Sequence, residues 1–540
     1  MTTEQEHTPL PDADAQSAGA PSSRPGWVTG EAVARWCARV SREGEGGAVS
    51  TALAPFDLTP VAAVPVCAPD DVARAVAAAR AAQEEWARTS PGRRAGVVLA
   101  FHDLLLERQE QVLDLVQWET GKARYHAWQE VAQVATIARH YARRARRHLA
   151  PKRVRGMVPG LTKVVEVRVP RGVVGVVSPW NYPLYLGVGD VLPALLAGNS
   201  VVSKADEQTA LTLLWARELM AEAGLPADVW RIVTGPGDVV GGALVDAVDY
   251  VCFTGSTATG RAVAERAARR LVGASLELGG KNPLIVRPDA DLAAAAHGTV
   301  TAAFANTGQM CIHIERVYAH EDVYDAFRDQ LVRHIRQLKL GRSYDYAADI
   351  GSLTSPARLA AVQAHVADAV AKGARVLVGG RARPDVGPLF YEPTVLEGVT
   401  GDMAVYAEET FGPVLSLSSY GTDDEAVRLA NQGSYGLSAS VWSKDTRAAA
   451  RLAARVRAGA VNINDGAAAA AGSIEAGMGG MGDSGLGRRH GAEGIRKYTE
   501  TRTVATQRLL PLGPQPGATA QDFVRRTNGQ LALLRRLRVR

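Results

Sequence analysis

The chain has 540 residues, of which 46% are hydrophobic and 22% are charged, and its formal net charge is +5 at pH 7. This length exceeds what one hydrophobic core supports, so two large domains are expected in a globular protein. The 61 lysines and arginines are dispersed along the chain and do not form a basic stripe interleaved with aromatic residues, which argues against nucleic acid as the main partner.

The cysteines and the apolar segments exclude several other classes of protein. Cys37, Cys67, Cys252 and Cys311 show no CxxC spacing, so the sequence predicts neither a metal site nor a disulfide framework. The N-terminus lacks the features of a signal peptide, and no apolar run approaches the roughly 18 residues of a membrane helix. We therefore expect a cytoplasmic protein without a membrane span.

The first part of the chain changes from a polar leader to helices. Residues 1–26 are acidic and rich in Pro, Ala and Ser, which predicts a disordered leader. From Asp70 to Glu130 the apolar residues recur at helical spacing, as in "DVARAVAAARAAQEEWAR".

Strands and helices alternate after residue 162. "TKVVEVRVPRGVVGVVSPWNYP" predicts two strands that end at Ser178, and three strand-helix units follow, beginning with "NSVVSKADE", "WRIVTG" and "VDYVCFTG". This alternation is typical of a parallel, doubly wound α/β sheet. A second α/β region runs from about Pro283 to Gly485.

The last thirty residues form a separate tail with six arginines among the final sixteen residues. A helix that binds a membrane surface or a partner is one interpretation of this composition. A solvated tail that lies along a neighbouring subunit is the other, and we favour it.

A nucleotide site is expected beyond the carboxyl ends of the strands in a doubly wound sheet. The motif GxGxxG is absent, but "FTGSTATG" joins a strand to a helix, with Gly255 at the turn and Ser256 at the helix N-terminus, where a phosphate can bind. Taken alone, Ser256 is more simply an N-cap. Lys204 and Glu207, at the end of another strand, add groups that suit ribose or phosphate.

Five linked segments give this site a family context. "SPWNYPL", "FTGSTATG", "LELGGKNP", "NTGQMC" and "EETFGPV" resemble, in order and spacing, the motifs of the aldehyde dehydrogenase superfamily. The resemblance covers about residues 50–506, and "MGGMGDSGLGRRHG" and "IRKYTE" are most similar to a bacterial succinate-semialdehyde dehydrogenase branch that is associated with NADP.

The resemblance implies an architecture of three parts within an α/β fold. A Rossmann-type NAD(P)-binding domain, an α/β catalytic domain and a small β oligomerisation arm are expected, and with them a homodimer or homotetramer. The corresponding residues are 27–155 and 171–280 for the first, 281–485 for the second, and 156–170 and 495–507 for the arm, followed by the basic tail at 508–540.

The resemblance also implies the chemistry. Cys311 is the expected nucleophile towards the aldehyde carbon, Asn181 joins the Cys311 backbone N–H in an oxyanion hole, and Glu277 activates the water that cleaves the thioester. Each of these residues alone has a plain structural interpretation, and their conjunction in matching motifs favours catalysis. NAD or NADP is expected to bind through Lys204, Glu207, Gly255, Ser256, Trp180, Glu409 and Phe411.

The substrate is the least constrained part of this prediction. Succinate semialdehyde is expected from the resemblance, with His313 and Tyr182 as candidate substrate-binding residues. However, Gly189 and Ala305 stand where that branch places arginines for the distal carboxylate. A medium-chain or aromatic aldehyde is therefore the alternative, and a cofactor-independent cysteine hydrolase or a non-catalytic scaffold is more remote. Glu207 would favour NAD by repelling a 2′-phosphate, so the preference between NAD and NADP stays open.

Overall fold

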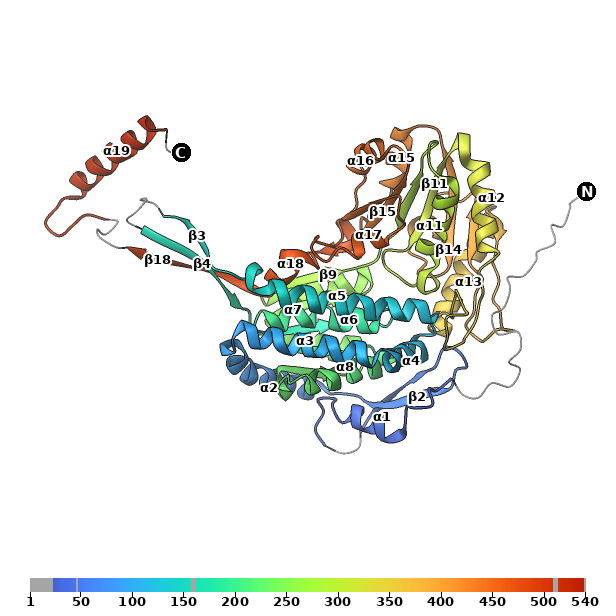
Figure 1. Ribbon diagram of the computed structural model, residues 1–540, viewed down its shortest axis with the longest axis horizontal. Coiled ribbons are helices and arrows are strands. Elements are labelled where there is room, and N and C mark those ends of the chain that lie inside the picture. The colour runs from blue at the N-terminus through green and yellow to red at the C-terminus, as the bar shows by residue number, and fades with distance from the viewer. Residues whose placement is uncertain (1–22, 45–46, 157–161, 508–512, 539–540) are drawn as a thin grey trace, which may run out of the picture.

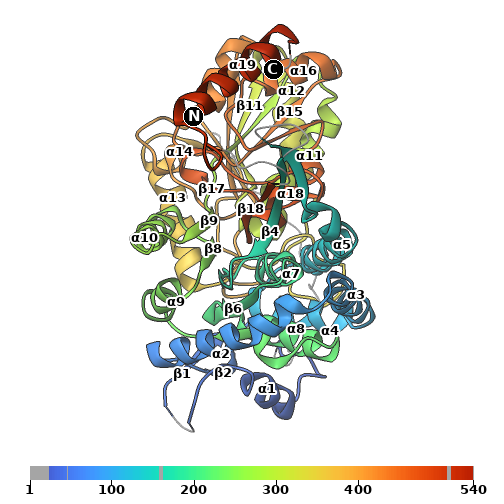
Figure 2. The ribbon, with the colours of Figure 1, turned by 90° about the vertical axis from the view of Figure 1, so that its left-hand side faces the viewer.

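The computed structural model describes residues 23–44, 47–156, 162–507 and 513–538. These residues form two α/β lobes, each built on its own sheet, together with a projecting arm and a C-terminal helix (Figures 1 and 2). The α/β fold expected from the alternating strands and helices is confirmed.

The first lobe contains a six-stranded sheet, parallel except at its β17–β9 edge. From β5 the chain proceeds to β6 and β7 and then crosses to β8 on the other side of β5. The carboxyl ends of β5 and β8 therefore form the switch point at which nucleotides bind such sheets. In spatial order the strands are β17 (Gly485–Leu486), β9 (Gly273–Glu277), β8 (Tyr250–Thr254), β5 (Val173–Val177), β6 (Ser200–Lys204) and β7 (Trp230–Val233).

Helices cover this sheet. The helix α2 packs against β5, β6 and β7, α10 packs against β8 and β9, and α3 and α5 pack against each other beside α7. A two-stranded ribbon of β1 (Val49–Leu53) and β2 (Pro60–Pro65) lies at the base. The helices of this lobe are α1 (Gly30–Cys37), α2 (Pro69–Arg88), α3 (Pro91–Glu107), α4 (Gln109–Thr120), α5 (Arg124–His148), α6 (Pro183–Val188), α7 (Val191–Leu196), α8 (Ala210–Glu222), α9 (Gly242–Ala247) and α10 (Thr257–Arg269).

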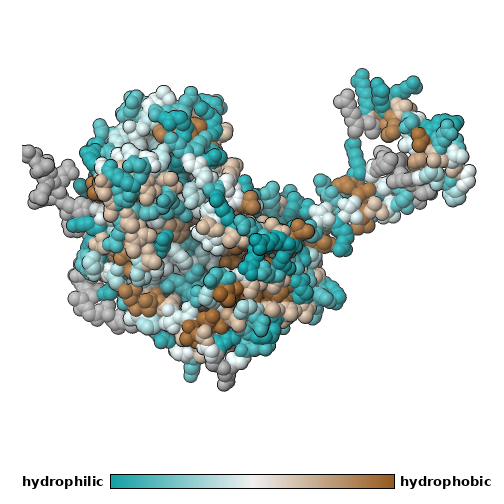
Figure 3. Space-filling view, turned by 180° about the vertical axis from the view of Figure 1, so that it is seen from behind, coloured by the Kyte–Doolittle hydropathy of each residue, from teal (hydrophilic) through white to brown (hydrophobic). Residues whose placement is uncertain are grey.

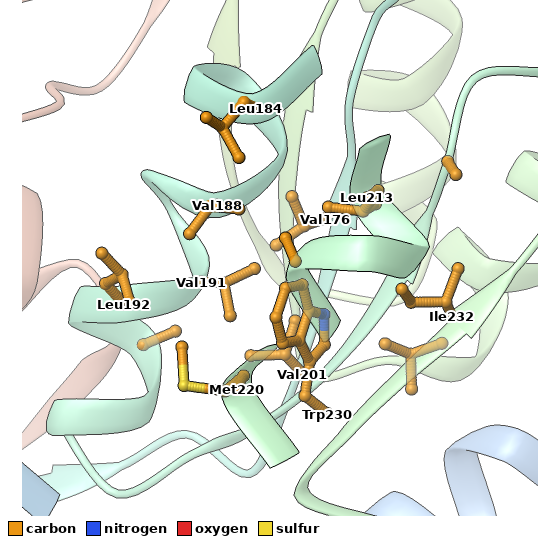
Figure 4. Close-up of a cluster of buried hydrophobic side chains, with 14 of the residues drawn as sticks. Val176, Leu184, Val188, Val191, Leu192, Val201, Leu213, Met220, Trp230 and Ile232 are labelled. Carbon is orange, nitrogen blue, oxygen red and sulfur yellow. The ribbon is translucent and has the colours of Figure 1, made fainter. Parts of the chain in front are cut away.

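A hydrophobic core beneath the sheet anchors the segment that follows β5. Leu184 and Val188 of α6 pack in one cluster with strand residues such as Val201 and with Trp230 (Figure 4). The Trp230 Nε1–H donates to Ser203 Oγ (2.9 Å), so this buried indole leaves no donor unpaired. Because α6 is fixed on the core, the preceding turn at residues 178–182 has a defined position.

The second lobe contains a seven-stranded sheet, parallel except where β12 pairs with β13. Its strands, in spatial order, are β12 (Arg375–Val378), β13 (Thr394–Glu397), β14 (Val414–Tyr420), β11 (Ile314–His320), β10 (Asn282–Val286), β15 (Ser438–Trp442) and β16 (Ala460–Ile463). Its helices are α11 (Leu292–Phe304), α12 (Tyr324–Ile335), α13 (Pro356–Ala371), α14 (Ala404–Ala407), α15 (Asp423–Ala430), α16 (Thr446–Ala453) and α17 (Ala468–Ala471), and α18 (Gly491–Arg496) follows after β17.

The arm is a three-stranded antiparallel sheet in the order β18–β4–β3. It comprises β3 (Lys152–Arg155), β4 (Thr162–Pro170) and β18 (Thr499–Gln507). The sequence analysis assigned residues 152–155 to the nucleotide-binding domain, and this boundary was wrong because Lys152–Arg155 pairs with β4. A four-residue strand has no periodicity of its own, so only its partner defines it.

The beginning of the chain also differs from expectation where it is described. Within the expected leader, the Ser23 N–H donates to Asp57 Oδ2 (2.8 Å) and the Tyr344 hydroxyl donates to the Ser23 carbonyl (2.5 Å), so residues 23–26 adjoin the body. The rest of the leader, residues 1–22, lies outside the described residues.

The tail contains α19 (Ala520–Arg536), and none of the described side chains of this helix is buried. Figure 3 shows the arm and this helix projecting from the body, with hydrophilic residues over much of their surface. Across the described parts of the chain, no helix combines the length and apolarity that crossing a membrane requires.

Candidate active site

One cavity of about 650 Å³ brings together the three predicted catalytic side chains, Asn181, Glu277 and Cys311. Asn181 follows β5 and Glu277 ends β9, so both come from the first lobe, whereas Cys311 precedes β11 of the second. The cavity therefore lies where the two lobes meet. Among the described residues, including those of this cavity, no group of three or more His, Cys, Asp or Glu side chains could hold a metal ion.

The turn before Cys311 has an unusual backbone conformation. Asn306, Thr307 and Gly308 all adopt left-handed φ angles, of +51°, +56° and +71°. For residues other than glycine this conformation is costly and needs support from its surroundings. The Thr307 hydroxyl donates to the Gly351 carbonyl (3.2 Å), and Gln309 Nε2 donates to the Asn306 carbonyl (3.1 Å). These bonds fix the turn that presents Cys311.

Side-chain amides fix the two segments that meet at the thiol. Asn282 Nδ2 donates to the Cys311 carbonyl (2.8 Å) and to the His313 carbonyl (2.7 Å). Asn181 Nδ2 donates to the Gln309 carbonyl (3.0 Å), two residues before Cys311. The Asn181 amide is thus held against the cysteine loop.

Burial dominates the acid-base properties of the cavity. Burial first, and then the nearby Glu277 and Glu409 carboxylates, raise the pKa of the Cys311 thiol to about 12. Burial also raises the pKa of Glu277 to about 7, against the attraction of Arg489 and Lys497. The thiol is therefore protonated at neutral pH and needs a base, and Glu277 titrates in the range where a carboxylate serves as one.

The buried carboxylate of Glu315 holds the loop that contains Glu409 and Phe411. Glu409 Oε1 accepts from the Gly280 N–H (2.9 Å), and Phe411, with φ of +50°, packs edge-on against Trp180 at 5.6 Å between ring centroids. Glu315 accepts from the N–H groups of Thr410 (3.0 Å) and Phe411 (3.3 Å) and pairs with Lys281. These contacts place an aromatic edge and a carboxylate beside the cysteine loop.

His313 does not take the position that the sequence analysis suggested. The structure places it 0% exposed, with Nδ1 against the Met310 carbonyl and Nε2 2.9 Å from Glu315 Oε1, and it is not among the described residues that line the cavity. Its assignment as a substrate-binding residue is therefore corrected. His313 directly precedes β11, and its imidazole lies in the interior beside the buried carboxylate of Glu315. Tyr182, the other candidate, does line the cavity.

The predicted cofactor residues lie at the carboxyl edge of the six-stranded sheet. Lys204 ends β6, Glu207 begins the next short helix, and exposed Ser256 caps α10, where its Oγ accepts from the Thr259 N–H (3.2 Å). Gly255 is required at its turn, because a Cβ there would come 2.6 Å from the Phe253 ring. An ammonium group, a carboxylate and an exposed helix N-terminus along one edge suit the phosphates and riboses of a dinucleotide.

The rest of the cavity wall is largely aromatic and apolar. The five aromatic residues that line it are Tyr125, Trp128, Tyr182, Tyr185 and Trp442. Among the described lining residues Arg489 is the one lysine or arginine, and its Nε and Nη2 donate to Asp190 Oδ2 (3.1 and 2.5 Å).

Of the two positions that lack arginine, one has no room for a side chain and the other lines the cavity. A Cβ at Gly189 would come 2.6 Å from the Tyr185 carbonyl oxygen, so this position has no room for a side chain. Ala305 is buried and lines the cavity. The carboxylate anchor of the related branch is therefore missing here for a steric reason at one of its two positions.

Sequence reasoning missed several residues that support the site. Lys122 and Glu130 form a buried pair behind Asn181, and Asp190 holds Arg489 beside Glu277. Lys122 lies between α4 and α5 and Glu130 lies within α5, and nothing in their local pattern distinguishes them from surface charges. Asp190 lies nine residues after Asn181, again without a motif of its own.

Comparison with known proteins identifies the family. Residues 42–504 match the model of the aldehyde dehydrogenase family. The chain belongs to the aldehyde dehydrogenase family. It is 51% identical over 454 residues, 84% of this chain and 88% of the relative, to a Mycolicibacterium smegmatis protein named "Putative succinate-semialdehyde dehydrogenase [NADP(+)]". A Mycobacterium tuberculosis protein whose name differs by an added numeral 2 is 50% identical over 86% of this chain and 90% of its own length.

Solved structures of aldehyde dehydrogenases confirm the fold. The NAD-dependent aldehyde dehydrogenase from Sinorhizobium meliloti has a TM-score of 0.84 and 35% identity over 91% of this chain and 99% of its own. A betaine aldehyde dehydrogenase from Staphylococcus aureus in complex with NAD+ has a TM-score of 0.84 and 31% identity over 89% of this chain and 97% of its own. NAD(P)-dependent oxidation of an aldehyde is therefore the activity of this aldehyde dehydrogenase.

Proposed function

We propose that this aldehyde dehydrogenase oxidises its substrate through a covalent intermediate on Cys311, with Asn181 and Glu277 as the other catalytic residues. The observation that supports this assignment most strongly is that the three side chains, which come from distant segments and from both lobes, line the same cavity. A structural cysteine would not need an amide and a titrating carboxylate beside it.

The first step of the proposed mechanism is attack of the Cys311 sulfur on the aldehyde carbon. Because the pKa of the thiol is raised, the proton must leave as the C–S bond forms, and Glu277 is the carboxylate in the cavity with a pKa near neutrality. The negative charge that develops on the aldehyde oxygen is stabilised by Asn181 Nδ2 and the Cys311 backbone N–H, and losing one such donor typically costs about 10²–10³ in rate.

When bound, NAD(P)+ supplies the hydride acceptor that turns the thiohemiacetal of Cys311 into a thioester. Lys204, Glu207 and Ser256 with Gly255 would hold the adenosine half, and Trp180, Glu409 and Phe411 the nicotinamide half. Glu277 must first release to solvent the proton that it took from Cys311. It then removes a proton from water as the water oxygen attacks the thioester carbon, and the C–S bond breaks to release the carboxylic acid while the departing Cys311 sulfur takes that proton back from Glu277.

Succinate semialdehyde is the first candidate substrate, because it appears in the names of the two mycobacterial relatives. An aromatic or medium-chain aldehyde is the second, and the observation that favours it is the aromatic cavity wall together with the lack of a cationic anchor at Gly189 and Ala305. The NADP in the relatives' names and the carboxylate of Glu207 point to different cofactors, so the proposal leaves NAD and NADP open. A homodimeric or homotetrameric assembly through the arm and a cytoplasmic location stay predictions.

Two measurements test this proposal. Cys311→Ala should abolish aldehyde-dependent reduction of NAD(P)+, while retained reduction would refute the covalent mechanism. The ratio of kcat/KM for succinate semialdehyde to that for hexanal and benzaldehyde, each with NAD and NADP, tests the substrate. A preference below about tenfold, or 1.4 kcal/mol, for the anionic aldehyde would remove succinate semialdehyde from the proposal and leave the chemistry intact.

A further inference from the structure

A fully buried charge pair lies directly behind the proposed oxyanion hole. Lys122 follows α4 and Glu130 lies in α5, both are 0% exposed, and Lys122 Nζ is 2.5 Å from Glu130 Oε1. Burial lowers the pKa of Lys122 and raises that of Glu130, and the attraction between them opposes both shifts. A pair of this kind adds little to stability compared with apolar residues of similar volume, so its presence calls for another explanation.

The ammonium group of Lys122 has contacts in three directions. Besides Glu130, Nζ donates to the Asn181 main-chain carbonyl (2.7 Å) and lies 4.0 Å from the centroid of the Tyr182 ring. An ammonium over an aromatic face is attracted by the ring, most strongly where water is excluded. Two of the three contacts are therefore to the turn that contains Asn181.

The carboxylate of Glu130 holds the other end of the same segment. Its Oε2 accepts from the N–H groups of Leu184 (2.9 Å) and Tyr185 (3.0 Å), in the first turn of α6. These N–H groups have no partner within the helix, so a carboxylate at this end is favourable. Lys122 and Glu130 together fix residues 181–185 from Asn181 to the beginning of the helix.

The hydrogen bond from Lys122 to the Asn181 carbonyl matters because Asn181 lies outside the helices and strands. Its carbonyl accepts from Lys122 and also from Asn306 Nδ2 (3.0 Å), and its own Nδ2 donates to the Gln309 carbonyl. No β ladder or helix orders the main chain at this residue, so other groups must fix the orientation of its peptide unit. Side-chain donors to the carbonyl take this role for Asn181.

We propose that Lys122 and Glu130 are positioning residues that direct the Asn181 amide towards the aldehyde oxygen. The inference rests on the proposed role of Asn181 as an oxyanion donor. It predicts that removing the pair slows the attack of Cys311 without altering the cofactor site, because Lys204, Glu207 and Ser256 do not contact Lys122 or Glu130 in the described structure.

The test is a double-mutant cycle on the full-length enzyme. Lys122→Met alone leaves Glu130 buried without a counter-charge and can prevent folding, so Lys122→Met/Glu130→Gln, which removes both charges, is the main variant. Its kcat/KM for the aldehyde should fall on the order of 10²-fold, as expected for a misplaced catalytic group, while the KM for NAD(P)+ stays unchanged. Added to Asn181→Ala, the same two substitutions should cause no further loss, because the residue through which they act is already gone.

Arg217→Met is the matched control. Arg217 is also buried and donates to the main-chain carbonyls of Trp230 and Ala227, away from the cavity. It should lower the thermal unfolding midpoint, because two main-chain carbonyls lose their donor, while kcat/KM stays that of the parent.

The outcomes separate this inference from the proposed mechanism. Full activity of Lys122→Met/Glu130→Gln, or losses that multiply with that of Asn181→Ala, would overturn the positioning role and leave the oxyanion role of Asn181 standing. Full activity of Asn181→Ala would instead refute the oxyanion role itself.

Discussion

The side-chain amide of Asn181 donates to the main-chain carbonyl of Gln309 at 3.0 Å. Asn181 follows β5 of the first lobe, and Gln309 lies in the left-handed turn that precedes Cys311 in the second lobe. This single hydrogen bond therefore joins the proposed oxyanion donor to the loop of the proposed nucleophile across the boundary between the lobes. Substitutions that disturb either partner of this bond should therefore change the rate at which Cys311 attacks the aldehyde carbon.

The pH dependence of catalysis should reflect Glu277. Burial raises the pKa of this carboxyl to about 7, and a carboxyl acts as a base only when it has lost its proton. We expect kcat/KM to approach its maximum above pH 7 and to fall as the pH drops through about 7. Glu277→Gln should remove this acid limb together with most of the activity. An acid limb near the ordinary carboxyl value of about 4.3 would contradict the assignment.

Gly308 should tolerate no side chain. It has φ of +71°, and a Cβ would come 2.0 Å from the Gly412 carbonyl oxygen. The left-handed conformation and the overlap together predict that Gly308→Ala lowers the free energy of unfolding by about 2–5 kcal/mol, with loss of activity because the Cys311 loop must move. Urea unfolding and kcat measure the two effects.

Gly373 provides the matched control for Gly308. Its φ is +102°, but nothing lies within 4 Å of a Cβ placed there, so Gly373→Ala should cost only the conformational term of about 1–2 kcal/mol and leave kcat unchanged. Equal effects at the two glycines would show that the contact with Gly412 is unimportant.

Glu207 should set the preference between the two dinucleotides. Its carboxylate lies at the carboxyl edge of β6, where it can accept from a ribose 2′-hydroxyl and would repel a 2′-phosphate. Removing the charge in Glu207→Gln should raise the ratio of kcat/KM with NADP to that with NAD about tenfold, equivalent to about 1.4 kcal/mol of relieved repulsion. Glu31→Gln, on the exposed face of α1, is the control and should leave the ratio unchanged. An unchanged ratio in Glu207→Gln would show that the Glu207 side chain turns away from the ribose and would contradict the prediction.

Trp128 should distinguish the two candidate substrate classes. It stacks on Tyr125 with 5.9 Å between centroids and lines the cavity from α5. Loss of an aromatic contact of about 0.5–1.5 kcal/mol in Trp128→Ala should lower kcat/KM for benzaldehyde roughly 2–10-fold, with little change for succinate semialdehyde. Tyr346→Ala, at an exposed aromatic residue outside the described cavity lining, is the control. Equal losses for both aldehydes in Trp128→Ala would indicate a general defect of the cavity.

The motifs predicted the catalytic set because each is local. The sequences around Asn181, Glu277 and Cys311 each combine a reactive residue with the glycines or turn residues that a strand end requires, and the alternation of strands and helices fixed the sheet that holds the first two. The same reasoning misplaced His313, because a residue two positions after Cys311 can face either the cavity or the interior. The partner that decided its direction is Glu315, two residues further along at the start of β11, and only the packing shows that this carboxylate is buried.

The sequence by itself therefore determined the family and the class of reaction of this aldehyde dehydrogenase, because the proposed nucleophile, amide, base and nucleotide-binding edge each stand in a short motif whose local backbone is encoded nearby. The tertiary structure alone decided what surrounds them: the Lys122–Glu130 pair behind Asn181, the Asp190–Arg489 pair beside Glu277, the aromatic cavity wall and the pairing of Lys152–Arg155 with the arm. Asp190 and Arg489 lie far apart in the chain, and a buried charge such as Lys122 looks in sequence the same as an exposed one until its burial and its partner are known. The acid-base properties of the site follow from that burial.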